Sequence, residues 1–217
     1  MELARPVATL GRGAAVGARA AGVLLFALAA QFMTVIMVAA SMAPGYDVAG
    51  GAISDLGVVP ETAGLFNASV IVAGLLNIAG GALFHRAHGR TWILVLFVLA
   101  GIGAIGAGVF PLDSGGPHGL FALAAFVGFN LEAIAVATVV SGPMRAISVL
   151  AGGVGLGYVV LMAIGDAGNA AAFGPIGHGG TERMIVYPAM LWMLAIGGYL
   201  MASAGEAAEA DRRTAAR

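Results

Sequence analysis

Few residues of this 217-residue chain are able to do chemistry, and most of them lie in or beside three turns between long apolar runs. A polar side chain at the end of a membrane helix must find a partner or pay for desolvation, so carboxylates, an imidazole and a guanidinium gathered there are candidates for holding a polar head group or an ion. The candidate ligand-binding residues are Ser54, Asp55, Asn67, Asp113, His118, Glu132, Glu182, Arg183 and Tyr187.

His118 and Glu132 are expected on one face of one helix. The separation between them corresponds to about 40° of rotation and about 21 Å of rise. A carboxyl at that depth costs about 2.5–3.5 kcal/mol to insert, so Glu132 should face the bundle interior. Its possible uncharged partners are Asn67, Asn77 and Gln31. Two interpretations stay open: a neutral carboxyl satisfied by an amide, or a proton carrier.

Arg183 and Tyr187 are four residues apart and therefore share a helix face. Arg183 stands on a side of the membrane that otherwise has no arginine, which predicts an ion pair with Asp55 or Asp113, or a clamp for an anionic head group. In the first long turn, Ser54 or Asp55 would cap a short helical turn. Alternatively, the turn folds back over the mouth of the bundle and brings Asp55 to Asp113 and His118.

A metal site is an alternative use of the same end of the molecule. Asp55, Asp113, His118 and His178 offer oxygen and nitrogen ligands for zinc, which would lower the pKa of a bound water towards 7 for hydrolysis of a lipid. A short ligand motif such as H-E-x-x-H is missing, so these four remain secondary candidates and no cofactor is expected.

Composition places these residues in a membrane protein. Hydrophobic residues make up 60% of the chain and charged ones 10%, whereas charged residues make up about a quarter of a soluble domain. A helical span needs about 20 mainly apolar residues. Six stretches meet this requirement, at about residues 18–43, 63–84, 92–110, 118–141, 146–165 and 184–204. We therefore predict an all-α bundle of six transmembrane helices over residues 18–204, with short arms at 1–17 and 205–217.

The arginines predict the orientation. All of them except Arg183 flank the runs on one side, and cytoplasmic loops retain basic residues. Both termini and both arms are therefore expected in the cytoplasm, with the protein in the plasma membrane.

The 35 glycines predict close helix packing, because lipid gives apolar helices no hydrophobic reason to associate. Small residues at four-residue spacing let two backbones approach. Ala100, Ala104 and Gly108 have this spacing in the third run, and Gly153 and Gly157 have it in the fifth.

Four motifs resemble one known family. They are I-S-D-L-G at 53–57, F-N at 66–67, G-V-F-P-L-D-S-G-G-P-H at 108–118, and G-T-E-R at 180–183 followed by Tyr187-Pro188. Together they resemble the prokaryotic six-span membrane family catalogued as domain of unknown function 998, over about residues 22–198. The resemblance implies that Ser54, Asp55, Asn67, Asp113, His118, Glu182 and Arg183 act together. It implies no activity.

Three functions fit these patterns. The first is binding or transport of a small polar or amphiphilic molecule at an outward-facing polar cavity, with Glu132 as a proton carrier below it. The second is a metal-dependent lipid hydrolase, and the third is a structural partner subunit without chemistry. Membrane lipids are expected partners and nucleic acid is not, because the sequence has no phosphate-binding glycine loop, no nucleophile elbow and no basic nucleic-acid-binding stripe.

Overall fold

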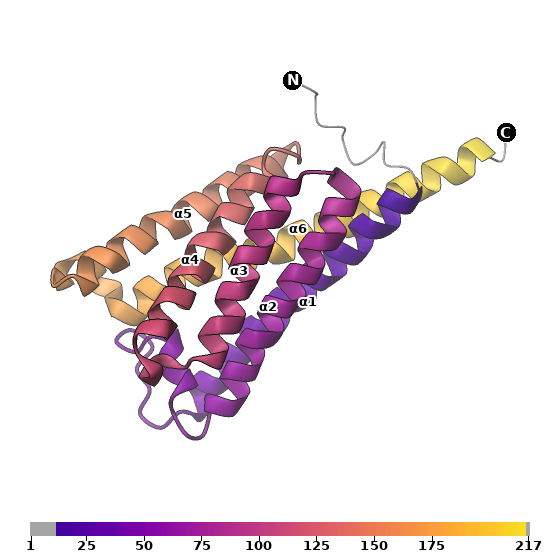
Figure 1. Cartoon of the computed structure of the whole chain (residues 1–217). Coiled ribbons are helices and arrows are strands. Elements are labelled where there is room, and N and C mark those ends of the chain that lie inside the picture. Colours follow the sequence, from indigo (N-terminus) through magenta and orange to yellow (C-terminus); the bar gives the residue numbers. More distant parts are fainter. Residues whose placement is uncertain (1–11, 216–217) are drawn as a thin grey trace.

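The chain folds into six long helices that pack side by side (Figure 1). The computed structural model describes residues 12–215, so residues 1–11 of the expected N-terminal arm, with Arg5, and residues 216–217 lie outside it. The long helices are α1 (Arg12–Met42), α2 (Ala63–His88), α3 (Thr91–Val109), α4 (Gly116–Val136), α5 (Pro143–Asp166) and α6 (Gly177–Ala215). All six are long and apolar enough to cross a membrane, and the described part contains no strand. The predicted all-α fold class with six spans is confirmed.

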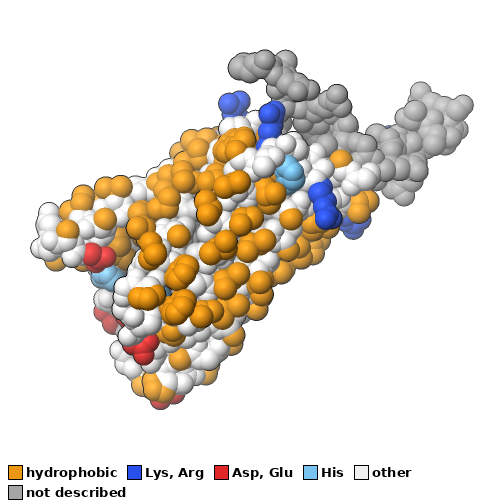
Figure 2. Space-filling model, viewed as in Figure 1, with side chains coloured by type: hydrophobic (Ala, Val, Ile, Leu, Met, Phe, Trp, Pro, Cys, Tyr) orange, Lys and Arg blue, Asp and Glu red, His pale blue; other side chains and the backbone are white. Residues whose placement is uncertain are grey.

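The helices form a closed ring in which each packs on its neighbours in sequence and α6 packs on α1. The start of α1 and the end of α6 lie together, with Ala15 packed against Ala204. The opposite end carries three short 3-10 helices, η2 (Ile53–Gly57), η3 (Leu112–Ser114) and η4 (Ala170–Ile176). Figure 2 shows basic side chains at the first end and acidic ones at the second, so the charge asymmetry read from the sequence is a feature of the folded molecule.

Several helix boundaries differ from the predicted ones, most clearly in α4 and α6. Helix α4 ends at Val136 and not near residue 141, because the Thr138 hydroxyl and backbone nitrogen both donate to the Ala135 carbonyl, at 2.6 and 3.1 Å. Such local bonds compete with the helical ladder. Helix α6 begins at Gly177, earlier than the expected 184, and continues to Ala215 through much of the expected tail.

The early start of α6 has a physical cause in the first loop. The first amides of a helix have no partner inside it. In α6, the Gly179 nitrogen donates to the Ala49 carbonyl at 2.9 Å, and the Gly180 nitrogen contacts the same oxygen at 3.4 Å. A side chain at position 179 would collide with the backbone at Gly51, so the loop can lie on the helix only because glycine stands there.

Small residues bring α3 close to its neighbours, as predicted. A Cβ added at Gly128 of α4 would lie 2.6 Å from the Cβ of Ala100, and one added at Gly108 would lie 2.8 Å from the Asn67 carbonyl oxygen of α2. Ala104 is buried on the same side of α3.

The corresponding prediction for α5 is wrong. Gly153 and Gly157 face open space, with no atom within 4 Å of an added Cβ. The close contacts are made by Gly152 and Gly155, which both pack against Asn130 of α4. Which face of a glycine-rich helix packs inward depends on its partners, and the spacing of glycines did not reveal them.

Candidate functional site

The loop of residues 43–62 folds over the acidic end of the bundle and is held there by Arg183. Its guanidinium donates to the Val48 carbonyl at 2.9 Å, to the Gly51 carbonyl at 3.1 Å and to the Tyr46 hydroxyl at 2.7 Å. It also donates to the Gly179 carbonyl of its own helix at 2.9 Å. Arg183 is 8% exposed, so its donors are directed into the protein.

The predicted ion pair of Arg183 with Asp55 or Asp113 is wrong. Among the described residues, neither carboxylate is paired with this guanidinium, because the backbone of the loop has taken its donors. Asp55 instead accepts a bond from the Ala52 nitrogen at 2.8 Å at the start of η2. The capping alternative for Asp55 is therefore confirmed.

Tyr46 forms part of the hydrogen-bonded cluster by which Arg183 holds the loop, which we call the loop clamp. Its hydroxyl donates to the Ala52 carbonyl at 2.6 Å and accepts the bond from Arg183. Burial raises the pKa of the Tyr46 phenol above its ordinary value, and the neighbouring Arg183 cation opposes part of that rise. Tyr46 thus helps to close the loop.

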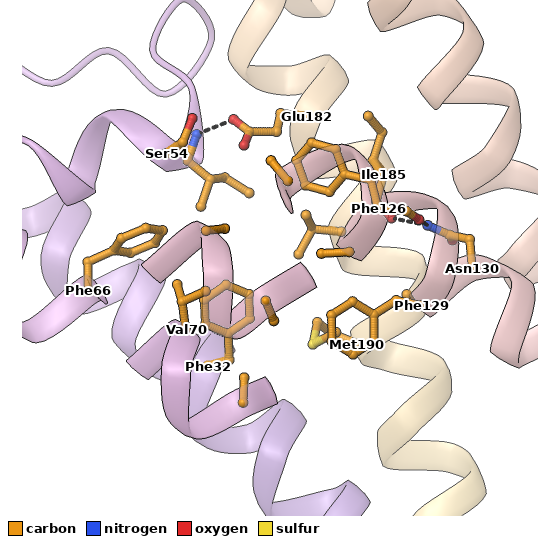
Figure 3. A pocket seen from close by; sticks show the side chains of 18 of the residues that line it. Phe32, Ser54, Phe66, Val70, Phe126, Phe129, Asn130, Glu182, Ile185 and Met190 are labelled. Carbon is orange, nitrogen blue, oxygen red and sulfur yellow. Dashed lines mark hydrogen bonds between the residues drawn. The ribbon is translucent and has the colours of Figure 1, made fainter. Parts of the chain in front are cut away.

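Two further bonds place η2 above the helices. The Glu182 carboxylate of α6 accepts a bond from the Ile53 nitrogen, which joins segments far apart in the sequence (Figure 3). The Asn67 amide of α2 donates to the Gly57 carbonyl at 2.8 Å. Glu182 and Asn67 therefore hold the two ends of η2, and Ser54 lies between those ends.

Beneath η2 is a cavity of about 70 Å³ inside the bundle. Its walls come from α1, α2, α3, α4 and α6 and are almost entirely apolar. Figure 3 shows Ser54 and Glu182 at one end, with Phe32 and Met190 away from them. The lining residues are Phe32, Ile53, Ser54, Phe66, Val70, Ala73, Ala104, Ala107, His118, Ala122, Ala125, Phe126, Phe129, Asn130, Glu182, Ile185, Val186, Ala189 and Met190.

A larger groove of about 290 Å³ lies between α4, α5 and α6 on the other side of the same wall. It is lined by Ser54, Leu112, His118, Gly119, Ala122, Leu123, Phe126, Val159, Met162, Ala163, Asp166, His178, Glu182 and Ile185. Six of these residues also border the cavity: Ser54, His118, Ala122, Phe126, Glu182 and Ile185. The polar groups that the two spaces share are therefore a serine, a histidine and a glutamate.

His118 has a defined tautomer in this wall. Its Nδ1 lies 2.8 Å from the Phe110 carbonyl oxygen, which can only accept, so Nδ1 carries the proton. In the neutral imidazole, Nε2 is then a hydrogen-bond acceptor. The turn from Phe110 to His118 thus orients one side chain of the site.

Glu132 lies apart from both spaces. It is fully buried, and the Asn77 amide donates to its Oε1 at 2.7 Å and also to the Phe97 carbonyl at 3.0 Å. Of the three partners considered, Asn77 is the one that binds it. This contact matches the interpretation of Glu132 as a carboxyl bound by an amide between α2 and α4 at one oxygen only, because Oε2 is buried without a hydrogen-bond partner among the described residues.

The remaining predicted residues are scattered. Asp113 is exposed, Tyr187 is half-buried against the core, and neither borders the cavity or the groove. His178 borders the groove and is paired with Asp166 at 3.2 Å. Within residues 12–215, no group of three or more potential ligands could hold a metal ion, so the four zinc candidates do not converge.

Sequence reasoning missed Asn130, which was not among the candidate residues. Its amide donates to the Phe126 carbonyl at 2.8 Å and to the Ile185 carbonyl of α6 at 3.1 Å. A buried amide in an apolar run needs a partner across helices, and that signal was available in the sequence. Asp166, which borders the groove, was not among the candidate residues either.

Fold and site together define a multi-pass membrane protein with a polar wall at one end of an apolar interior. More particularly, residues 20–199 match the family described as "Protein of unknown function (DUF998)", and the chain belongs to that family. The family expected from the four motifs is therefore confirmed. No curated protein and no solved structure gives a significant match to the chain.

Proposed function

We propose that this protein binds an amphiphilic molecule, with the head group in the groove between α4, α5 and α6 and the apolar chain directed into the bundle. The main support for the proposal is the set of six residues that border both spaces, which we call the shared wall. Ser54, His118 and Glu182 border both an apolar cavity and a more open groove. One end of an amphiphile needs polar partners and the other needs apolar walls, and the two needs are met on opposite sides of these three residues.

The sizes of the two spaces support this arrangement. Small-molecule pockets begin at roughly 300 Å³, which is close to the groove, and the cavity adds room for a short apolar segment. A space with apolar walls does not hold water well and accepts apolar groups. The half of α5 beside the groove exposes Val160 and Ile164, so a molecule dissolved in lipid can approach the groove laterally.

The charge distribution supports a location for the site. Basic residues lie at the end where α1 starts and α6 stops, and acidic residues lie at the end that carries the groove. With the basic end in the cytoplasm, the groove opens at the outer leaflet of the plasma membrane.

Binding is the part of the earlier hypothesis that this geometry supports. Transport would also need a polar path beyond the cavity. On the side away from Glu182, however, the cavity is lined by the apolar residues Phe129 and Met190. Glu132 borders neither space, so we assign it no role in the bound state.

The proposal is tested by placing a larger side chain at the shared wall, where it would fill part of both spaces. Ala122 borders both spaces, whereas Ala124 on the same helix is exposed and borders neither. The protein in phosphatidylcholine nanodiscs is titrated with dodecanol, dodecylamine and dodecyl phosphate, and thermal stability is measured. We expect at least one probe to stabilise the wild type and Ala124→Phe but not Ala122→Phe. If no probe distinguishes the two variants, the proposal is wrong.

A further inference from the structure

We infer that the groove selects amphiphiles whose head group donates hydrogen bonds and carries no negative charge, such as a long-chain amine or alcohol, over phosphates and carboxylates. This inference rests on the proposed function and names the chemical class of its ligand. It follows from which polar groups face the groove and which groups are already occupied.

Two of the groups in the shared wall are acceptors. The Nδ1–H of His118 is used by the Phe110 carbonyl, which leaves Nε2 of the neutral ring as an acceptor. Glu182 has a carboxylate that can only accept when ionised, and one of its two oxygens already accepts the Ile53 nitrogen. With Glu182 ionised, a head group that donates hydrogen bonds satisfies the acceptors that His118 and Glu182 still offer, whereas an anionic head group meets a carboxylate and an acceptor nitrogen.

The outer rim of the groove adds no free positive charge. Asp166 contributes a second carboxylate, and His178 is paired with it at 3.2 Å. Protonation of His178 would therefore leave this pair neutral. Ser54, the third polar group of the shared wall, can donate or accept and does not discriminate.

The nearby cation is already bound. Arg183 follows Glu182 directly and is the only arginine between Arg145 and Arg212 in a chain without lysine. It borders neither space, and its donors go to the loop carbonyls, to the Gly179 carbonyl and to the Tyr46 hydroxyl. The guanidinium expected to clamp an anionic head group instead fastens the loop that covers the cavity.

The test compares amphiphiles that have the same twelve-carbon chain and differ only in the head group. The affinities of dodecylamine, dodecanol and dodecyl phosphate are measured by titration of the whole protein in phosphatidylcholine nanodiscs, with Ala122→Phe as the blank for partition into the bilayer. We expect dodecylamine and dodecanol to bind at least about tenfold more tightly than dodecyl phosphate, because like charges in a binding site are strongly unfavourable. Dodecyl phosphate binding as tightly as the other two would overturn the inference and leave the proposed function standing. Failure of all three to bind would overturn both.

Two variants test the cause of the selectivity. Glu182→Gln keeps an acceptor and removes the charge, so the preference for amine over phosphate should shrink while alcohol binding changes little. Asp166→Asn removes a carboxylate from the rim without contacting η2, and it should shrink the preference less. It also serves as the readout if Glu182→Gln does not fold. An unchanged preference in the variants that fold would contradict the electrostatic explanation.

Discussion

The first half of helix α5 (residues 143–155) packs closely against its neighbours, whereas the second half (residues 156–166) borders the groove. We call them the closed half and the open half. In the first half, Ser148, Gly152 and Gly155 are buried, and the Trp192 indole of α6 donates to the Ser148 hydroxyl at 2.8 Å. In the second half, Val159, Met162 and Ala163 line the groove, and no residue from 156 to 164 is buried. Figure 1 shows α5 diverging from α4 along this half.

The comparison shows how a binding space is made in an apolar bundle. Where glycines face α4, the backbones come into contact and the interior closes. Asn130 stands at the boundary, because Gly155 packs against its side chain and its amide bonds to α6. Beyond Gly155, Val159, Met162 and Ala163 line the groove, and the space between α5 and α4 is left open.

The largest effect is expected from breaking the closed half. Gly152→Ala would place a methyl group against the backbone oxygen of Asn130, and such overpacking costs about 1–3 kcal/mol. The matched control is Gly153→Ala on the exposed face, where alanine should stabilise the helix by roughly 0.5–1 kcal/mol. Unfolding in mixed micelles with increasing SDS measures both. Equal effects of the two substitutions would show that α5 does not pack through Gly152.

A smaller difference in the free energy of unfolding is expected when a polar residue of the closed half and an apolar residue of the open half are each replaced by alanine. Ser148→Ala leaves the buried Trp192 indole nitrogen without its partner, and this should cost about 1 kcal/mol. Val159→Ala borders the groove and should change the free energy of unfolding by less than about 0.5 kcal/mol. The same SDS titration ranks the pair, and a larger loss for Val159→Ala would mean that the groove is packed shut.

The smallest effect concerns the loop that covers the open end. The pKa of Tyr46 is raised by burial, so the folded protein keeps the phenol proton at a pH where the unfolded chain has lost it. The stabilisation from Tyr46 is therefore fully present below about pH 10 and is lost as the pH rises through the higher pKa of the folded state. The chain has four tyrosines, so the difference between the ultraviolet titrations of wild type and Tyr46→Phe isolates this group. A midpoint at or below the ordinary value would contradict the buried clamp.

The sequence by itself determined the six spans, their all-α class and the charge asymmetry between the two ends. These follow from composition and from the length needed to cross lipid, which are additive properties of local segments. It also predicted that Glu132 would face inward, because a carboxyl deep in a span is costly to expose to lipid. His118 and Glu182 were among its candidate ligand-binding residues.

Only the tertiary structure decided what each polar group binds. Arg183 was predicted to pair with a carboxylate, but it bonds to backbone carbonyls of a loop that lies more than a hundred residues earlier in the chain. Asp113 remained exposed, while Asn130, which was not among the candidate residues, lines the cavity and bonds α4 to α6. Partners of this kind depend on which helices meet and at what height, and that arrangement is a property of the packed bundle as a whole.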